Sequence, residues 1–161
     1  MDYLHHYQSP IGSITIAGSG DAIIGLWFNG QKHFAEGLDA NRKTGTLPIF
    51  AETDRWLDLY FSGRKPGFRP KLCMRSTSFR KAVWEILLSI PYGQTMTYGD
   101  VAAEMGMSGR AVRAIGNAVG HNPISLIIPC HRVVGANGRL TGYTGGIEKK
   151  AFLLNLEQEG L

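Results

Sequence analysis

The segment between residues 62 and 75 is the feature that most constrains how this chain can fold. Its sequence, SGRKPGFRPKLCMR, contains two prolines, two glycines and many charged residues. Proline and glycine clusters interrupt helices and strands, so the stretch is typical of a connector. A chain of 161 residues is long enough for one ordinary domain or two small lobes. The connector therefore predicts a boundary between an N-terminal and a C-terminal lobe.

The sequence before the connector predicts a β-hairpin followed by a helix. Two largely apolar runs, GSITIAG at 12–18 and AIIGLWF at 22–28, flank a turn that contains glycine. This is the pattern of two antiparallel strands. The stretch AETDRWLDLYFSG then has apolar side chains at helical spacing, at Trp56, Leu57, Tyr60 and Phe61.

After the connector, the stretch STSFRKAVWEILLSI predicts a longer helix. The residues PYG that follow are expected to end this helix. Ser76 or Thr77 can cap this helix. Its buried side is expected to consist of Phe79, Val83, Ile86 and Leu87.

Two short helices follow at about 97–120 and predict a helix-turn-helix. Thr97 with Asp100 three residues later is a capping signal for YGDVAAEMG, and Ser108 offers a cap for GRAVRAIGNAVG. Two short helices joined by a tight turn are the arrangement of this motif.

The second helix of this pair has two different faces. Its apolar side is expected to consist of Ala111, Val112, Ile115, Ala118 and Val119. Its other side carries Arg110, Arg113, Ala114 and Asn117. A helix face with few bulky side chains can approach a groove of DNA closely, and arginines on it can reach phosphates or base edges. The same pattern also fits a surface helix packed in a bundle.

A long stretch in the second half of the chain contains no acidic residues. The net charge is +4, and no acidic residue occurs at 105–147, where the charged residues are Arg110, Arg113, Arg132 and Arg139. Such a stretch favours a surface that meets phosphate. The alternative is a solvated face that lacks carboxylates by chance.

Several classes of protein are not expected. No apolar run approaches 18 residues, so no membrane span is predicted. The start, MDYLHHYQSP, lacks the features of a signal peptide. A cytoplasmic location follows, in which Cys73 and Cys130 are expected to stay reduced.

The stretch SLIIPCHRVV at 125–134 places Cys130 beside His131. The apolar run predicts a strand, and Pro129 predicts that the strand ends there and the backbone turns. After such a turn the imidazole can reach the sulfur, directly or through a water, and activate it as the thiolate. Asn122 and Glu157 are both candidates for orienting the histidine. The alternative is that Cys130 is a small apolar residue of the core.

The motif IPCHRVV, preceded by GNAVGHNP and followed by GANGRLTGYTGG, closely resembles the O6-alkylguanine-DNA alkyltransferases, also called methylated-DNA–protein-cysteine methyltransferases. The resemblance runs from about Phe79 to Glu157 and is looser over residues 1–75. It implies an α/β fold of the α+β type. A ribonuclease-H-like sheet and helix lobe would occupy residues 1–72. A mainly helical lobe with a winged helix-turn-helix would occupy residues 76–161.

The resemblance also implies the chemistry. Cys130 would accept the alkyl group once and irreversibly, from O6-alkylguanine and also from O4-alkylthymine, after the base is flipped out of double-stranded DNA. His131 would take the thiol proton through a water, Glu157 would orient His131, and Asn122 would hold the turn. The protein would act as a monomer without a cofactor.

Further roles carry over residue by residue. Substrate contacts would come from Tyr98, Val133, Tyr143, Thr144 and Gly145, together with the Cys130 carbonyl. DNA contacts in the minor groove would come from Arg110, Arg113, Ala114, Asn117 and Tyr98. Arg113 would enter the base stack in place of the guanine.

Some residues depart from the family or have no role in it. Ser125 stands where some relatives have proline, which bears on the tolerated alkyl size. No metal is expected, because Cys73 has no second cysteine nearby and the pair at 5 and 6 is a weak ligand set. His33 and His121 are expected to be solvated or to cap helices.

Three other functions compete with this interpretation. A non-catalytic lesion binder of the alkyltransferase-like type would lack the cysteine, which is present here. A Cys-His hydrolase would need an oxyanion hole that nothing in the sequence supports. A plain helix-turn-helix regulator would explain residues 97–120 but neither Cys130 nor Glu157.

Overall fold

A four-stranded sheet dominates the first part of the chain in the computed structural model, which describes residues 1–159. The strands are β1 (Tyr3–Ser9), β2 (Gly12–Ser19), β3 (Ala22–Phe28) and β4 (Lys43–Thr44). Their order is β3-β2-β1-β4, with antiparallel pairing except for the parallel contact between β1 and β4. The expected hairpin is confirmed as β2 and β3, and β1 is an additional strand that the sequence did not predict.

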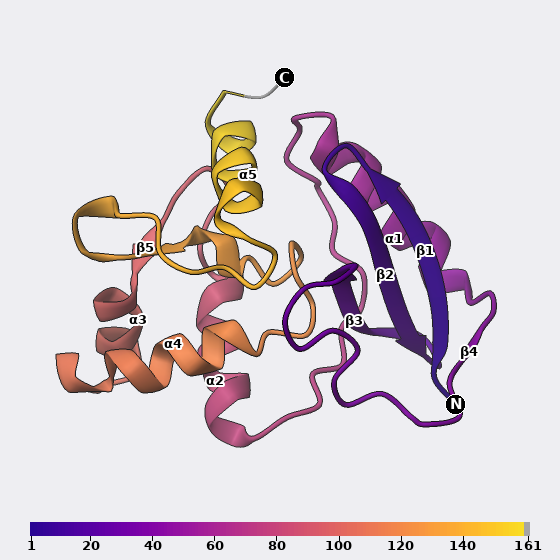
Figure 1. Cartoon of the computed structure of the whole chain (residues 1–161), viewed down its shortest axis with the longest axis horizontal. Coiled ribbons are helices and arrows are strands. Elements are labelled where there is room, and N and C mark those ends of the chain that lie inside the picture. The colour runs from indigo at the N-terminus through magenta and orange to yellow at the C-terminus, as the bar shows by residue number, and fades with distance from the viewer. Residues whose placement is uncertain (160–161) are drawn as a thin grey trace.

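Helix α1 (Pro48–Phe61) packs against β1, β2 and β3 (Figure 1). The predicted helix is therefore confirmed, but it begins earlier, because a proline suits the first helical turn. The helix approaches β2 so closely that a Cβ on Gly18 would lie 2.9 Å from the ring of Phe50.

Helices dominate the second part. They are α2 (Ser78–Leu88), α3 (Tyr98–Glu104), α4 (Val112–Gly120) and α5 (Ile147–Glu159). Two short strands, β5 (Met96–Thr97) and β6 (Val133–Val134), pair in parallel. Short 3₁₀ helices lie at Gly109–Ala111, Cys130–Arg132 and Ala136–Gly138. The mixed α+β class expected for this chain is confirmed.

The caps of these helices match the prediction only in part. Thr77, not Ser76, caps α2 by accepting from the Arg80 amide. Thr97 and Asp100 form a reciprocal capping box at α3. Ser108 makes no capping hydrogen bond through its side chain, because a 3₁₀ turn precedes α4.

The two faces of α4 also differ slightly from the prediction. Ile115, Ala118 and Val119 are buried as expected. Val112 is 37% exposed and does not belong to the buried face. A 3₁₀ turn has fewer residues per turn than an α-helix, so the face is rotated where the helix begins.

The edge of β3 joins the two parts of the chain. Leu26 donates from its amide to the Pro123 carbonyl at 2.8 Å, and the Ser125 amide donates to the Leu26 carbonyl at 2.9 Å. One hydrophobic core contains residues from both parts. The segment that leads to Cys130 is therefore fixed to the N-terminal sheet. Among residues 1–159, no helix is long and apolar enough to cross a membrane.

Candidate active site at Cys130

A turn held by Asn122 delivers the chain to Cys130. The Asn122 side chain donates to the Ile128 carbonyl at 2.8 Å and accepts from the Ile124 amide at 3.0 Å. Leu126 adopts a positive φ of 71° inside this turn. The strand predicted before Pro129 is therefore wrong, because these contacts fold residues 125–128 into turns. The backbone turn after Pro129 is present, as a 3₁₀ helix that begins at Cys130.

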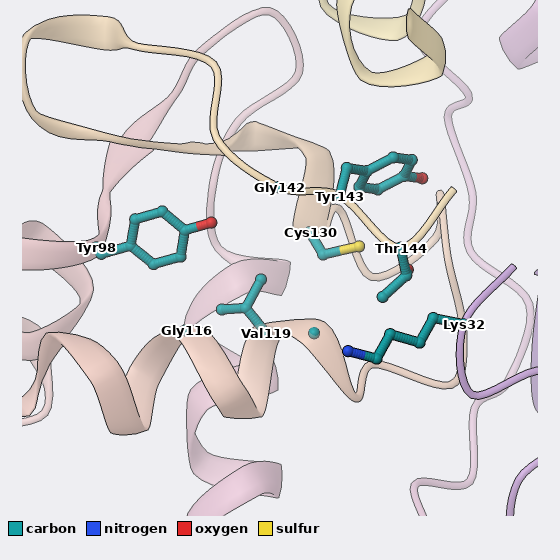
Figure 2. A pocket seen from close by; sticks show the side chains of 9 residues that line it. Lys32, Tyr98, Gly116, Val119, Cys130, Gly142, Tyr143 and Thr144 are labelled. Carbon is teal, nitrogen blue, oxygen red and sulfur yellow. The ribbon is translucent and has the colours of Figure 1, made fainter. Parts of the chain in front are cut away.

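Cys130 is 3% exposed and lies at the wall of a pocket of about 330 Å³ (Figure 2). The lining residues are Lys32, Tyr98, Gly116, Val119, Gly120, Cys130, Gly142, Tyr143 and Thr144. The volume falls in the range of small-molecule sites. The structure thus brings Tyr98, Tyr143 and Thr144, for which the resemblance implies substrate contacts, to one cavity with the sulfur.

The imidazole of His131 is held from behind by Glu157. Nε2 of His131 lies 2.6 Å from Oε2 of Glu157, and both side chains are buried. Burial lowers the pKa of His131, although the carboxylate opposes this, so the ring is neutral near neutral pH. The ionised carboxylate can only accept, which places the ring proton on Nε2. Nδ1 of His131, which has no hydrogen-bond partner among residues 1–159, is then free to accept a proton.

Glu157 is the centre of a buried polar network. It accepts from the Tyr60 hydroxyl at 2.6 Å, from Nε of Arg132 at 2.8 Å and from the Gly93 amide at 3.1 Å. Burial alone would raise the pKa of Glu157, but His131 and Arg132 together lower it to about 2. Of the two candidates for orienting His131, the structure therefore places Glu157 in contact with the imidazole, whereas Asn122 bonds to backbone groups of the turn.

The sequence missed the parts of Tyr60 and Arg132 in this network. Tyr60 was assigned only to the apolar side of its helix, and its hydroxyl reaches Glu157 from the other part of the chain. Arg132 was counted only as a surface charge, yet it is 8% exposed and donates to the Ile90 carbonyl as well as to Glu157.

Lys150 is a third side chain that the sequence missed. It is 1% exposed, and its Nζ donates to the Val133 carbonyl at 2.6 Å and to the Thr141 carbonyl at 3.3 Å. A signal was present, because Lys150, Leu153 and Glu157 share one helical face through their spacing. Lys150 thereby fixes β6 to the segment that carries the pocket wall.

The surroundings of Cys130 favour the neutral thiol over the thiolate that its histidine neighbour led us to expect. Burial raises the pKa of Cys130, and the opposing effects of Asn122 and Lys150 are smaller. His131 is neutral and therefore adds no positive charge beside the sulfur. The proton must leave the thiol during the reaction and not before it.

We expect Cys130 to react with iodoacetamide at about pH 7.5 at least about tenfold more slowly than Cys73, because the thiolate is the reactive form. Cys73 is exposed and serves as an internal control. Mass spectrometry of peptides after timed labelling measures both rates. Faster labelling of Cys130 than of Cys73 would show that the free protein does stabilise the anion.

The other expected site residues are distributed as follows. Arg110, Arg113, Ala114 and Asn117 are all exposed at the start and along one side of α4. Val133 is fully buried, and its carbonyl already accepts from Lys150.

Two residues expected beside the substrate do not line the pocket. Gly145 lies against the rings of Tyr143 and Phe28, which would both meet a Cβ at this position. Ser125 is fully buried and is also absent from the pocket wall.

A buried thiol next to a His–Glu pair, close to the helices α3 and α4 with their exposed arginine-bearing side, defines a protein that combines a nucleophile with a positively charged helical surface. The chain belongs to the 6-O-methylguanine DNA methyltransferase family. The ribonuclease-like domain of that family matches residues 3–72, and its DNA binding domain matches residues 78–159.

Relatives with this activity in their names match nearly the whole chain. The methylated-DNA–protein-cysteine methyltransferase of Mycobacterium tuberculosis is 44% identical over 95% of this chain and 92% of its own length. The protein of the same name from Methanosarcina barkeri is 44% identical over 99% of each chain. The crystal structure of Mycobacterium tuberculosis OGT in complex with DNA has a TM-score of 0.88 at 42% identity, covering 98% of this chain and 94% of that one.

Proposed function

We propose that this protein repairs DNA by moving the alkyl group of O6-alkylguanine, and of O4-alkylthymine, irreversibly onto Cys130. The observation that carries the proposal is the place of the sulfur. It lies at the wall of a base-sized pocket that also touches Gly116 and Val119 of α4. The DNA complex of the Mycobacterium tuberculosis relative supports DNA as the partner, and we propose that this DNA is double-stranded.

The chemistry is a displacement at carbon. The sulfur attacks the alkyl carbon, the bond from this carbon to O6 breaks, and guanine leaves with the electron pair. The thiol proton passes to Nδ1 of His131, through a water, and guanine takes up a proton in turn. Tyr98 and the Thr144 amide donate to O6 as charge develops there. The product is a thioether, which offers no bond for water to break, so each molecule acts once.

The target base must leave the helix before the sulfur can reach it, at a cost of about a few kcal/mol. The exposed side of α4 has only a small side chain at Ala114, which suits close approach to the minor groove. Arg110 and Asn117 then contact the DNA backbone. Arg113 enters the stack and keeps the gap from closing. The Val133 carbonyl, which already accepts from Lys150, then also accepts from the bound base, and Gly145 acts through the ring of Tyr143 that lies against it.

We also propose that the protein acts as a monomer in the cytoplasm and needs no cofactor. The two cysteines are unpaired, as suits a reducing compartment.

The deciding experiment is the intact mass of the protein after incubation with duplex DNA that carries one O6-methylguanine. We expect each protein molecule to gain one methyl group and no more. Peptide mapping should place this methyl group on Cys130. Repeated turnover by the same molecules, or a methyl group on another residue, would contradict the proposal.

Replacing Arg113 with alanine is expected to slow repair of duplex DNA by about 10- to 100-fold, because the wedge that offsets unstacking is lost. The rate of reaction with the free O6-methylguanine base should change by less than about twofold, since no DNA duplex has to be opened. Single-turnover rates with both substrates measure the difference. Arg110→Ala, in the 3₁₀ helix directly before α4, is the matched control and should weaken binding without this split. Equal losses on both substrates would refute the wedge role.

A further inference from the structure

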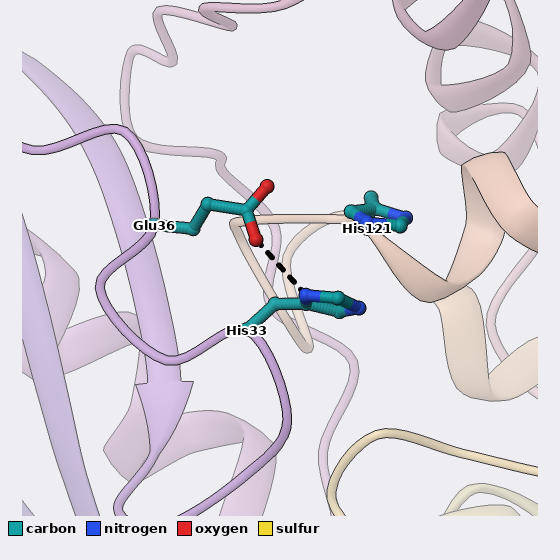
Figure 3. A group of neighbouring side chains, drawn as sticks. All are labelled: His33, Glu36 and His121. Carbon is teal, nitrogen blue, oxygen red and sulfur yellow. Dashed lines mark ion pairs between the residues drawn. The ribbon is translucent and has the colours of Figure 1, made fainter.

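A second cluster of chemically active side chains lies outside the pocket. His33 and Glu36 belong to the segment after β3, and His121 directly follows α4 (Figure 3). Nδ1 of His33 lies 2.9 Å from Oε2 of Glu36, and the rings of His33 and His121 stack with centroids 3.9 Å apart. One ligand atom of each residue lies within 4.8 Å of the others. None of these residues has a part in the proposed alkyl transfer.

We propose that His33, Glu36 and His121 bind one Zn²⁺ ion. Two histidines and one glutamate are a ligand set that zinc accepts, with a fourth position left for water. His121 is already arranged for this role, because its Nδ1 hydrogen-bonds to the Asn117 carbonyl at 2.9 Å. Metal-binding histidines commonly use one ring nitrogen in this way, which directs the other nitrogen to the metal.

The geometry requires only side-chain movement. Tetrahedral zinc with bonds of about 2.0–2.1 Å separates its ligand atoms by about 3.3 Å. The present separations of up to 4.8 Å must therefore shrink by at most about 1.5 Å. The side chains of His33 and Glu36 are 28% and 54% exposed, so an ion can enter and both side chains can adjust.

The position of the site gives it a consequence for the pocket. The segment that carries His33 also carries Lys32, and Lys32 lines the pocket together with Val119 and Gly120 from the end of α4. A metal bound between His33 and His121 joins these two walls. Zinc therefore fixes Lys32 at the pocket and reduces the motion of this wall.

The test is a zinc titration of the full chain in competition with a chromophoric chelator, at about pH 7.5. We expect one Zn²⁺ per molecule in the wild type. His33→Asn and His121→Ala should each raise the dissociation constant at least about tenfold. Asparagine is chosen because His33 has a φ of 62°, a conformation that asparagine tolerates. His5→Asn, at the half-exposed pair with Asp54, is the matched control and should leave the constant unchanged.

Two further measurements separate this site from other zinc ligands. Co²⁺ should bind in place of zinc without a sulfur-to-metal charge-transfer band, because neither cysteine belongs to the cluster. Amide exchange at residues 31–37 should slow with zinc in the wild type and not in His121→Ala. Unchanged affinity in both folded variants, or a cobalt spectrum with sulfur ligation, would overturn the proposal. None of these readouts involves DNA, so the result is independent of the repair function.

Discussion

Replacing Cys130 with serine is expected to abolish methyl transfer. The hydroxyl of serine is far less acidic than a thiol, and the neutral imidazole of His131 is too weak a base to remove its proton. The rate should fall by at least about 1,000-fold, which corresponds to about 4 kcal/mol in activation free energy. Single-turnover assays with methylated duplex DNA, followed by intact mass, measure this loss.

The serine variant should keep its fold and its affinity for DNA. Serine has nearly the shape of cysteine, and the hydrogen bonds of Asn122 that hold the turn are not affected. Urea unfolding and DNA titration test this. Cys73→Ser changes an exposed thiol and should retain full activity. If Cys130→Ser still removes the methyl group, another residue is the acceptor and the proposed function is wrong.

The elements of the fold were predictable where neighbours in sequence decide them. The alternation in β2 and β3 and the helical spacing in α1 are local patterns, and the capping box of Thr97 and Asp100 spans three residues. Strand β1 was not predicted, because its polar residues, such as His5 and His6, obscure the alternation of apolar and polar side chains. The strand expected before Pro129 failed because the contacts of Asn122 that fold this stretch are not visible as an apolar pattern.

The candidate site was predictable only as far as its motif extends. Cys130 and His131 are adjacent in sequence, and the resemblance supplied Glu157. Tyr60 could not be assigned to the same network, because its contact with Glu157 depends on how the two parts of the chain pack. The protonation state of the thiol also depends on packing, since it is burial that raises the pKa of Cys130. The chemistry at the sulfur is therefore set by the whole fold.

Replacing Glu157 with glutamine should have the largest effect on stability. Glutamine keeps the shape of the side chain but leaves the guanidinium of Arg132 buried without an opposite charge. Removing one partner of a buried ion pair costs about 3–5 kcal/mol. Alkyl transfer should slow as well, because the positive imidazolium that forms when His131 takes the proton loses its carboxylate. Urea unfolding near neutral pH and single-turnover rates measure the two effects.

The pH dependence distinguishes loss of charge from loss of packing. Because the pKa of Glu157 is lowered to about 2 in the folded protein, from an ordinary value of 4.5, the unfolded chain binds the proton more tightly. The contribution of Glu157 is therefore complete above about pH 5 and disappears as the pH falls towards 2. The difference in stability between wild type and Glu157→Gln should narrow over this range. Asp54→Asn, at the half-exposed pair with His5, should cost at most about 1 kcal/mol. A constant difference between wild type and Glu157→Gln down to pH 2 would show that the variant acts through packing, and the ion pair would then not be what holds His131 in place.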